Sequence, residues 1–411
     1  MRTIIRGMIC TIIVSVAGVT QGAEYELRPS IAVSEEFTDN LFNTSTNRIS
    51  DYITHATPGI AANYKAPALN GDLTYLFDYR WYARHNRDDE IAHSLSAKSR
   101  LTAVENFLFL DVSEEYQRVS LNATRDVSKE SLFINQSDRN VVFASPYVTF
   151  RPTDRLGVKS GYRFTDTRYF NSSGVDKTDH NAFLAVAYEL TKRWSLTADY
   201  TFVRELATVD NFNQHLVLGG FRYEYTDKSY AFAQAGKAWI DYDRGYGLNT
   251  IVWNAGVTHE FDTATATLTT GVKYNEDPSG NALQESFVSG RFEKRFTRGS
   301  LVLSPSYSEY VKTETDSLQT KKYGVTAQGQ YDILSGLNGK LAVTTEKYEQ
   351  HDQPLRSSHT NRIQIDSGLS YLLAREMTAA LSYVYVDYSS PGVASDNWHV
   401  NRVTLEIKKT F

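Results

Sequence analysis

Residues 73–82 read LTYLFDYRWY, and this stretch decides the fold class. Every second residue from Leu73 to Trp81 is apolar or aromatic, whereas the residues between them include Asp78 and Arg80. Successive side chains of a β-strand point to opposite faces, so the segment predicts a strand with one apolar face and one charged face.

The same period of two recurs along the chain. Predicted strands of about 10–14 residues exceed the usual length of about 5–6 in soluble sheets, and aromatic residues crowd the ends of the apolar faces. This pattern is typical of a transmembrane barrel with an apolar outside and a polar lumen, although short strands of a soluble β protein would alternate in the same way. Further examples lie at residues 158–165, 196–202, 217–225, 266–274, 288–296, 362–371 and 402–408.

Short turns alternate with longer polar loops, such as the turn at 151–155 and the loop at 122–139. Outer-membrane barrels place short turns in the periplasm and longer loops outside. Counting hairpins from Glu24 to Phe411 predicts an all-β, antiparallel, up-and-down transmembrane barrel of about 20 strands, with 18 or 16 as alternatives. The longest loop, 122–139, either covers the surface or folds inward as a constriction.

The composition excludes several classes of protein. The 411 residues include one cysteine and carry a formal net charge of −5, and the mean hydropathy is −0.41. These values exclude a disulfide scaffold, a cysteine-ligated metal protein and a bundle of membrane helices. Without a basic excess, nucleic acid is not an expected partner.

Residues 1–22 predict a secretory signal peptide. Arg2 and Arg6 precede an apolar run at residues 8–19, and small residues follow up to Ala23. Cleavage after Gly22 would leave residues 23–411 as the barrel, without cysteine, and the loss of two arginines would change the net charge from −5 to −7. We therefore expect export to the bacterial outer membrane.

The chain ends NRVTLEIKKTF. A terminal aromatic residue preceded by apolar residues two positions apart resembles the signal recognised by the outer-membrane barrel insertion machinery. Lys409 departs from that pattern. The resemblance implies two partners, the insertion machinery and outer-membrane lipid, and it rests on Val403, Leu405, Ile407 and Phe411.

Motifs of catalysis and cofactor binding are missing from the sequence. It contains no G-x-S-x-G, Walker loop, H-E-x-x-H or C-x-x-C-H motif. The nine histidines are scattered without the spacing of a metal-ligand pair. We therefore expect no catalytic residue, no metal and no cofactor, and a protein that is not an enzyme.

The charged strand faces are the candidate functional feature. In the strands that we identified, ten inward basic residues face six inward acidic ones. A lumen with net positive charge would concentrate anions, because low-dielectric walls focus the field. The alternative is that the charges pair and stiffen the wall. The residues predicted to set selectivity are Arg80, Lys159, Arg163, Arg222, Lys273, Arg291, Arg295, Arg362 and Arg402.

Two segments of the first hairpin, Ser34–Phe42 (SEEFTDNLF) and Asp51–Ile60 (DYITHATPGI), carry a family resemblance. They resemble outer-membrane β-barrel proteins whose genes accompany exopolysaccharide and exosortase (PEP-CTERM) clusters. Residues 112–119 and 147–169 are similar to the strand pattern of that family. The resemblance implies a porin-like barrel for passage of a polysaccharide across the outer membrane, with a periplasmic export partner, and implies no catalytic residues.

The residues of the first-hairpin motif also admit local explanations. We expect Asp39 and Asn40 to end the first strand, and Thr57-Pro58-Gly59 to break or bulge the second, because proline lacks an amide donor. The alternative is that Asp39, Asn40 and Asp51 contact Ca²⁺ or a sugar.

The sequence therefore predicts an outer-membrane pore that passes a polysaccharide, and the positive lumen favours an anionic one. Three alternatives remain open. The protein could be a general diffusion or uptake porin, a structural or adhesive barrel with a filled lumen, or a sheath around a periplasmic electron carrier.

Overall fold

The computed structural model describes residues 22–120, 136–170, 174–208, 210–245, 247–276, 282–313, 317–351, 358–390 and 397–411. These residues form twenty strands and no helix. The strands are β1 (Glu24–Thr38), β2 (Asp51–Lys65), β3 (Leu69–Tyr82), β4 (Glu90–Val104), β5 (Leu108–Ser120), β6 (Gln136–Thr153), β7 (Leu156–Tyr169), β8 (Lys177–Glu189), β9 (Trp194–Ala207), β10 (Phe212–Glu224), β11 (Tyr230–Tyr242), β12 (Gly247–Glu260), β13 (Ala264–Glu276), β14 (Ala282–Phe296), β15 (Gly299–Lys312), β16 (Ser317–Leu334), β17 (Leu337–Gln350), β18 (Ser358–Ala374), β19 (Met377–Ser389) and β20 (Trp398–Thr410).

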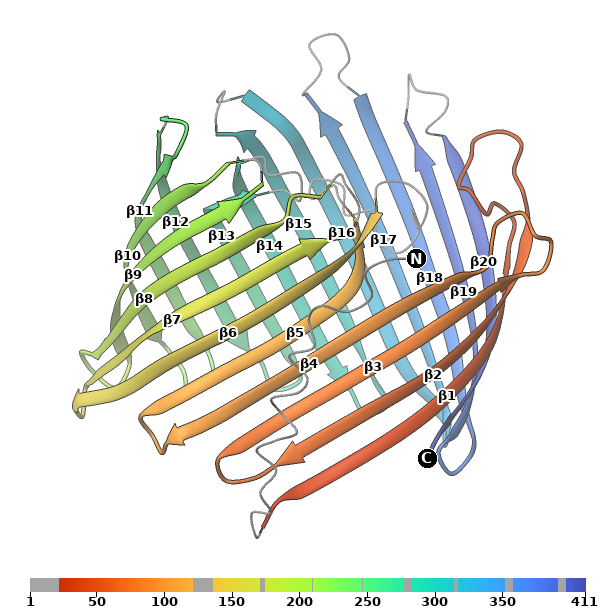
Figure 1. Ribbon diagram of the computed structural model, residues 1–411, viewed down its shortest axis with the longest axis horizontal. Helices are drawn as coiled ribbons and strands as arrows, with labels where there is room; N and C mark the ends of the chain where they lie inside the picture. Colours follow the sequence, from red (N-terminus) through yellow and green to blue (C-terminus); the bar gives the residue numbers. More distant parts are fainter. Residues whose placement is uncertain are drawn as a thin grey trace.

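The twenty strands form one closed antiparallel sheet (Figure 1). Each strand pairs with its neighbours in the chain, and β1 also pairs with β20. The predicted up-and-down barrel of twenty strands is confirmed, and the alternatives of 18 and 16 strands are not. The strands run from 13 residues in β5 to 18 in β6, somewhat longer than predicted.

The outer face of the barrel is apolar. On β20, Val403, Leu405 and Ile407 are 40–55% exposed. Val33 of β1 stands opposite Ile407 and is itself 51% exposed, so the apolar surface continues across the junction of the first and last strands. Closure gives every strand a hydrogen-bonded neighbour on both sides, which is what a sheet needs to cross a bilayer.

Aromatic residues mark both ends of this apolar face. At the turn end, Trp194 of β9 stacks on Tyr223 of β10 at 4.4 Å between ring centres. Nearer the loop end, outward histidines accept or donate a hydrogen bond with tyrosines of the preceding strand, as in Tyr200 with His215 at 2.9 Å. Such girdles lie at the two interfaces of a membrane. The same arrangement joins Tyr75 to His93 and Tyr162 to His180.

The first-hairpin motif closes the junction between β1 and β20, which we call the seam. Asp39 accepts hydrogen bonds at 2.7 Å from both the backbone and the side-chain amide of Asn401. Asn40, which is fully buried, donates to the carbonyl oxygens of His399 and Thr44 at 2.9 and 2.8 Å. The expected strand end at Asp39 is confirmed, and its side chain holds the last strand in register.

The expected break at Thr57-Pro58-Gly59 is wrong. The ladder between β1 and β2 runs without a shift from one end to the other, with Pro58 opposite Ile31. Towards β3, pairs are missing only at Thr57 and Pro58, and the register resumes unchanged at Gly59. Because proline has no amide donor, the ladder between β2 and β3 lacks two pairs at this point. The strand does not bulge.

Side chains fill part of the lumen at the loop end, on both sides of the seam. Leu41, Ile53 and Tyr82 form one buried cluster, and Val386, Tyr388 and Val400 form another. Leu41 belongs to the loop between β1 and β2, so this loop packs against the inner wall. The loop predicted at 122–139 lies outside the described residues, except where its end forms β6.

Loops at this end are also tied to neighbouring strands. Arg204 of β9 donates to both carboxylate oxygens of Asp243, in the loop after β11, at 2.8 and 2.7 Å. This guanidinium lowers the pKa of Asp243 below its ordinary value.

In the described part of the chain, no helix is long and apolar enough to cross a membrane. The predicted signal peptide lies outside the described residues, apart from Gly22.

Candidate functional site

The inner face of the barrel is the candidate site, and the strand registers place the predicted selectivity residues on it. On β7, Lys159 and Arg163 alternate with outward Val158 and Tyr162. Val158 stands opposite Phe150 of β6, which is 42% exposed on the outer surface. The same alternation puts the other seven predicted cations on the inner face of β3, β10, β13, β14, β18 and β20.

Seven of the nine predicted cations have a carboxylate within 4.0 Å. This supports, for these seven, the alternative that charges pair along the wall. The pairs are Arg80 with Asp78 (2.7 Å), Arg222 with Glu224 (3.1 Å), Lys273 with Glu285 (3.1 Å), Arg291 and Arg295 with Glu293 (3.0 and 3.3 Å), Arg362 with Glu346 (2.6 Å) and Arg402 with Glu36 (3.9 Å).

Arg362 illustrates a cation that solutes do not reach. Its side chain is 3% exposed and binds Glu346, which also binds Lys322 at 3.1 Å. Arg362 additionally donates to Gln364 on the same strand. A buried, hydrogen-bonded triad across β16, β17 and β18 stiffens the wall, and Glu346 offsets part of its positive charge.

Lys159 and Arg163 differ from the other seven. Both are exposed on the lumen side, and no described acidic side chain lies within 4.0 Å of either. Both rest on aromatic rings. Arg222 and Lys273 also contact rings, but each of these two has a carboxylate partner as well. The Nζ of Lys159 lies 4.1 Å from the ring centre of Tyr147, and the Cζ of Arg163 lies 5.3 Å from that of Phe183. A cation–π contact positions a cation without cancelling its charge.

These rings belong to a row that runs across four strands. Phe109 of β5 stands opposite Tyr147 of β6, Tyr147 opposite Gly161 of β7, and Gly161 opposite Phe183 of β8. We call Phe109, Tyr147 and Phe183 the aromatic row. Phe109 and Tyr147 stack at 5.2 Å with an angle of 19° between ring planes.

Sequence reasoning missed the aromatic row. Residues 139–151 do carry a signal, because Arg139, Phe143, Tyr147 and Arg151 recur at every fourth position and so share one face of a strand. That face is the inner one, since Tyr147 lies against inward Lys159.

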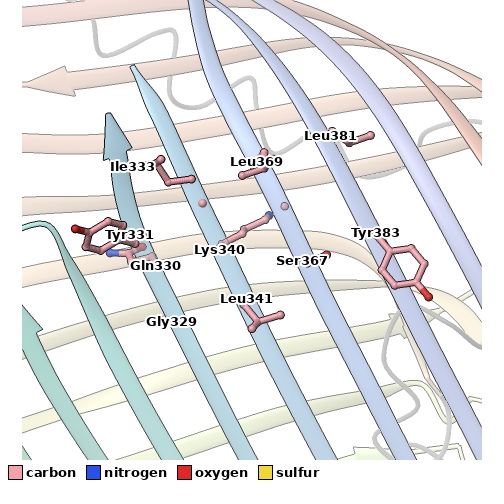
Figure 2. A pocket seen from close by; sticks show the side chains of 12 residues that line it. Gly329, Gln330, Tyr331, Ile333, Lys340, Leu341, Ser367, Leu369, Leu381 and Tyr383 are labelled. Atoms are coloured by element: carbon pink, nitrogen blue, oxygen red, sulfur yellow. The ribbon is translucent and has the colours of Figure 1, made fainter. Parts of the chain in front are cut away.

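A hollow of about 690 Å³ adjoins the aromatic row on the turn side. Its lining includes Phe109, Lys159 and Asp199, and small residues such as Gly157 and Ala185 make room for it. A second hollow, of about 450 Å³, lies elsewhere. Figure 2 shows it among apolar side chains of β16–β19, including Tyr331, Leu341, Leu369 and Tyr383. These side chains point outward, so this hollow faces lipid and is not part of the lumen.

The residues considered for Ca²⁺ or sugar are engaged in the fold. Asp39 and Asn40 hold the seam. Asp51 is fully buried and accepts hydrogen bonds from the backbone amides of Tyr52 and Arg84 and from the side-chain amide of Asn86. Among the described residues there is no group of three side chains able to hold a metal ion.

A closed barrel with an apolar outer face, aromatic girdles and a charged lumen defines the class of this protein: it is a transmembrane β-barrel of the bacterial outer membrane. No family model and no curated protein matches the chain.

Several solved outer-membrane proteins are similar to the chain over nearly its whole length. OpdK of Pseudomonas aeruginosa is 11% identical, with a TM-score of 0.45, and the match covers 94% of this chain and 98% of OpdK. OccAB3 of Acinetobacter baumannii is 11% identical, with a TM-score of 0.44 and coverage of 94% and 99%. A loop-deletion mutant of OmpT of Vibrio cholerae is 12% identical, with a TM-score of 0.39 and coverage of 95% and 99%.

Proposed function

We propose that the protein is a porin-like diffusion pore that favours anionic solutes. The observation that carries the proposal is the pair of exposed luminal cations, Lys159 and Arg163, which no described carboxylate neutralises. Barrels of 16–18 strands already leave an aqueous channel, and this one has twenty. Passage is by diffusion, and luminal charge sets the preference between anions and cations.

The finer proposal is that the solute is an acidic polysaccharide, passed to the outside with a periplasmic export partner. It rests on the resemblance of the first hairpin and on the luminal cations. Blockade of the channel by an acidic polysaccharide, but not by a neutral one of the same length, is the expected result. Equal blockade by both would contradict this choice of solute.

The pore itself is tested by conductance of the refolded protein in a planar bilayer, with the reversal potential measured in a salt gradient. We expect a large, anion-selective conductance. The double variant Lys159→Gln with Arg163→Gln removes two exposed charges, so its reversal potential should move towards the value for an unselective pore.

A matched control removes a neutral pair. Arg222→Gln with Glu224→Gln deletes a cation together with its own carboxylate and should leave the reversal potential nearly unchanged. A folded barrel without conductance would overturn the pore and favour a structural or adhesive barrel. Charge reversal of Arg291 and Arg295 without any change in ion selectivity would also count against it.

A further inference from the structure

We propose that Lys159, Arg163 and Phe183 form a luminal binding site for a cyclic carboxylate, a solute with both a ring and a carboxylate group. The site deepens the proposed function, because the solute reaches it through the lumen. It assigns the selective step to one wall of the pore, formed by β5, β6, β7 and β8.

The two cations converge on one ring. The Nζ of Lys159 lies 5.8 Å from the ring centre of Phe183, and the Cζ of Arg163 lies 5.3 Å from the same centre. On β7 the two residues stand two positions to either side of Gly161, on the same inner face. An anion above Phe183 is therefore within reach of both charges.

Gly161 makes this convergence possible. A Cβ atom at this position would lie 2.9 Å from Cζ of Phe183 and 2.5 Å from Cβ of Tyr147. The missing side chain thus leaves the space in which the ring of Phe183 lies across β7, between the two cations. Phe109 and Phe183, the half-buried rings of the aromatic row, supply apolar surface beside them, whereas Tyr147 between them is buried.

The charge at the site is available to a solute. The nearest luminal acids of the neighbouring strands are engaged elsewhere or lack contact with these cations. Asp111 binds Arg100 through two hydrogen bonds at 2.7 and 3.0 Å. Asp199, in the adjoining hollow, accepts from the side-chain amide of Gln234 at 3.5 Å. A solute carboxylate can therefore supply the counter-charge to Lys159 and Arg163.

The apolar part of the site distinguishes a cyclic carboxylate from a simple anion. Phe109, Phe143 and Phe183 are half-buried, so each exposes part of its ring to the aqueous lumen. Such apolar surface is not needed to attract small ions. Ligand sites combine apolar and aromatic walls with a few charged groups, in hollows of about 300–1,000 Å³. The adjoining hollow of about 690 Å³ is in that range and shares Lys159 with the site.

Isothermal titration calorimetry on the full refolded protein in detergent tests this, because binding is measured whether or not the pore conducts. The probes are galacturonate, a sugar acid, and benzoate, an aromatic acid. Acetate provides a carboxylate without a ring, and glucose a ring without charge. We expect galacturonate or benzoate to bind at least 10-fold more tightly than acetate and glucose.

Two variants measure separately how much the cations and the aromatic ring contribute to binding. Lys159→Gln with Arg163→Gln, and separately Phe183→Leu, should each weaken binding of the cyclic carboxylate by at least 10-fold. Phe183→Leu keeps apolar volume, so the barrel should fold. The matched control, Lys340→Gln with Lys408→Gln, removes two exposed luminal charges from β17 and β20 and should change the affinity less than 2-fold.

The binding results distinguish the proposed site from the proposed pore. Tighter binding of galacturonate than of benzoate would show that the site prefers a sugar acid. The reverse order would show that it prefers an aromatic acid. Acetate binding as tightly as both, or an equal loss of affinity in the lysine control, would overturn the site while leaving an anion-selective pore intact. Specific binding without conductance would overturn the pore and leave the site standing.

Discussion

At the scale of single residues, the same side chain facing the same lumen has opposite roles, depending on what surrounds it. Arg362 is 3% exposed and paired with Glu346, whereas Arg163 is exposed and rests on the rings of Phe183 and Phe143. Alternation along a strand predicts only the face of the sheet. The surroundings of the side chain, on its own strand and on the next one, decide whether its charge is paired within the wall or exposed to the lumen.

Gly161 has no room for a side chain, so its substitution by alanine should destabilise the barrel. Gly161→Ala places a methyl group 2.5 Å from Cβ of Tyr147 and 2.6 Å from the carbonyl oxygen of Pro146. Because the backbone carbonyl has little freedom to move, we expect the free energy of unfolding to fall by about 1–3 kcal/mol, the usual cost of overpacking. The measurement is urea unfolding of the refolded barrel.

Gly219→Ala is the control, because a Cβ there meets no atom within 4 Å. We expect a change within about 0.5 kcal/mol, as for ordinary surface substitutions. Equal stability of the two variants would show that the gap at Gly161 is not needed for packing of the aromatic row.

At the scale of elements, the seam is the one pairing in the described sheet between strands that are not consecutive in the chain. Every other ladder joins strands connected by one turn or loop, whereas β1 and β20 come from opposite ends of the chain. Their ladder runs only from Ser30 to Thr38 on β1. The hydrogen bonds that Asp39 accepts from Asn401 and that Asn40 donates to His399 extend the junction beyond this ladder, into the loop end.

Asn40 is the residue whose loss should weaken the seam. Asn40→Ala leaves the carbonyl oxygens of His399 and Thr44 without this donor in a buried place. We expect a loss of about 1–3 kcal/mol, the cost of an unsatisfied buried polar group, seen as a lower urea midpoint.

The control is Asn338→Ala, which removes an exposed hydrogen bond to Asp332 at 2.6 Å, next to a turn. Its effect on the midpoint should be small. If both alanine variants unfold at the wild-type midpoint, the seam does not depend on the first-hairpin motif.

At the scale of the whole molecule, the barrel separates two environments by its two faces. The outer face meets lipid with apolar and aromatic side chains, and the inner face holds ion pairs together with exposed cations, among them Lys159 and Arg163 on aromatic rings. The selectivity that we propose for this pore is electrostatic, so it should depend on screening by salt.

We expect the anion preference to fall as the salt concentration rises from 0.1 to 1 M, because the Debye length shrinks from about 10 Å to about 3 Å. Reversal potentials measured at a constant salt ratio across this range provide the test. The variant without Lys159 and Arg163 charges should show a weaker dependence. A preference that is independent of salt in both proteins would mean that pore size, rather than charge, sets selectivity.

Much of this protein follows from the sequence alone. The period of two and the spacing of turns predicted the antiparallel barrel, its twenty strands, its apolar outside and the inward position of all nine selectivity candidates. These properties are local, because successive side chains of a strand must alternate whatever the strand pairs with. The same local reasoning failed at Pro58, where continuous pairing with β1 overrides the missing donor.

Only the tertiary structure decided which residues meet across strands. Phe109, Tyr147, Gly161 and Phe183 lie on four different strands, and the register of three ladders brings them into one row. The ion pairs of Lys273, Arg362 and Arg402 with carboxylates of the next strand, and the closing of the seam by Asp39 and Asn40, depend on register in the same way. The carboxylates that pair with Arg80, Arg222, Arg291 and Arg295 stand two positions away on the same strand, so these four pairs follow from alternation alone. Alternation along a strand restricts register only to shifts of an even number of residues, so the exact pairing is decided by the turns and by the ladders of the folded sheet.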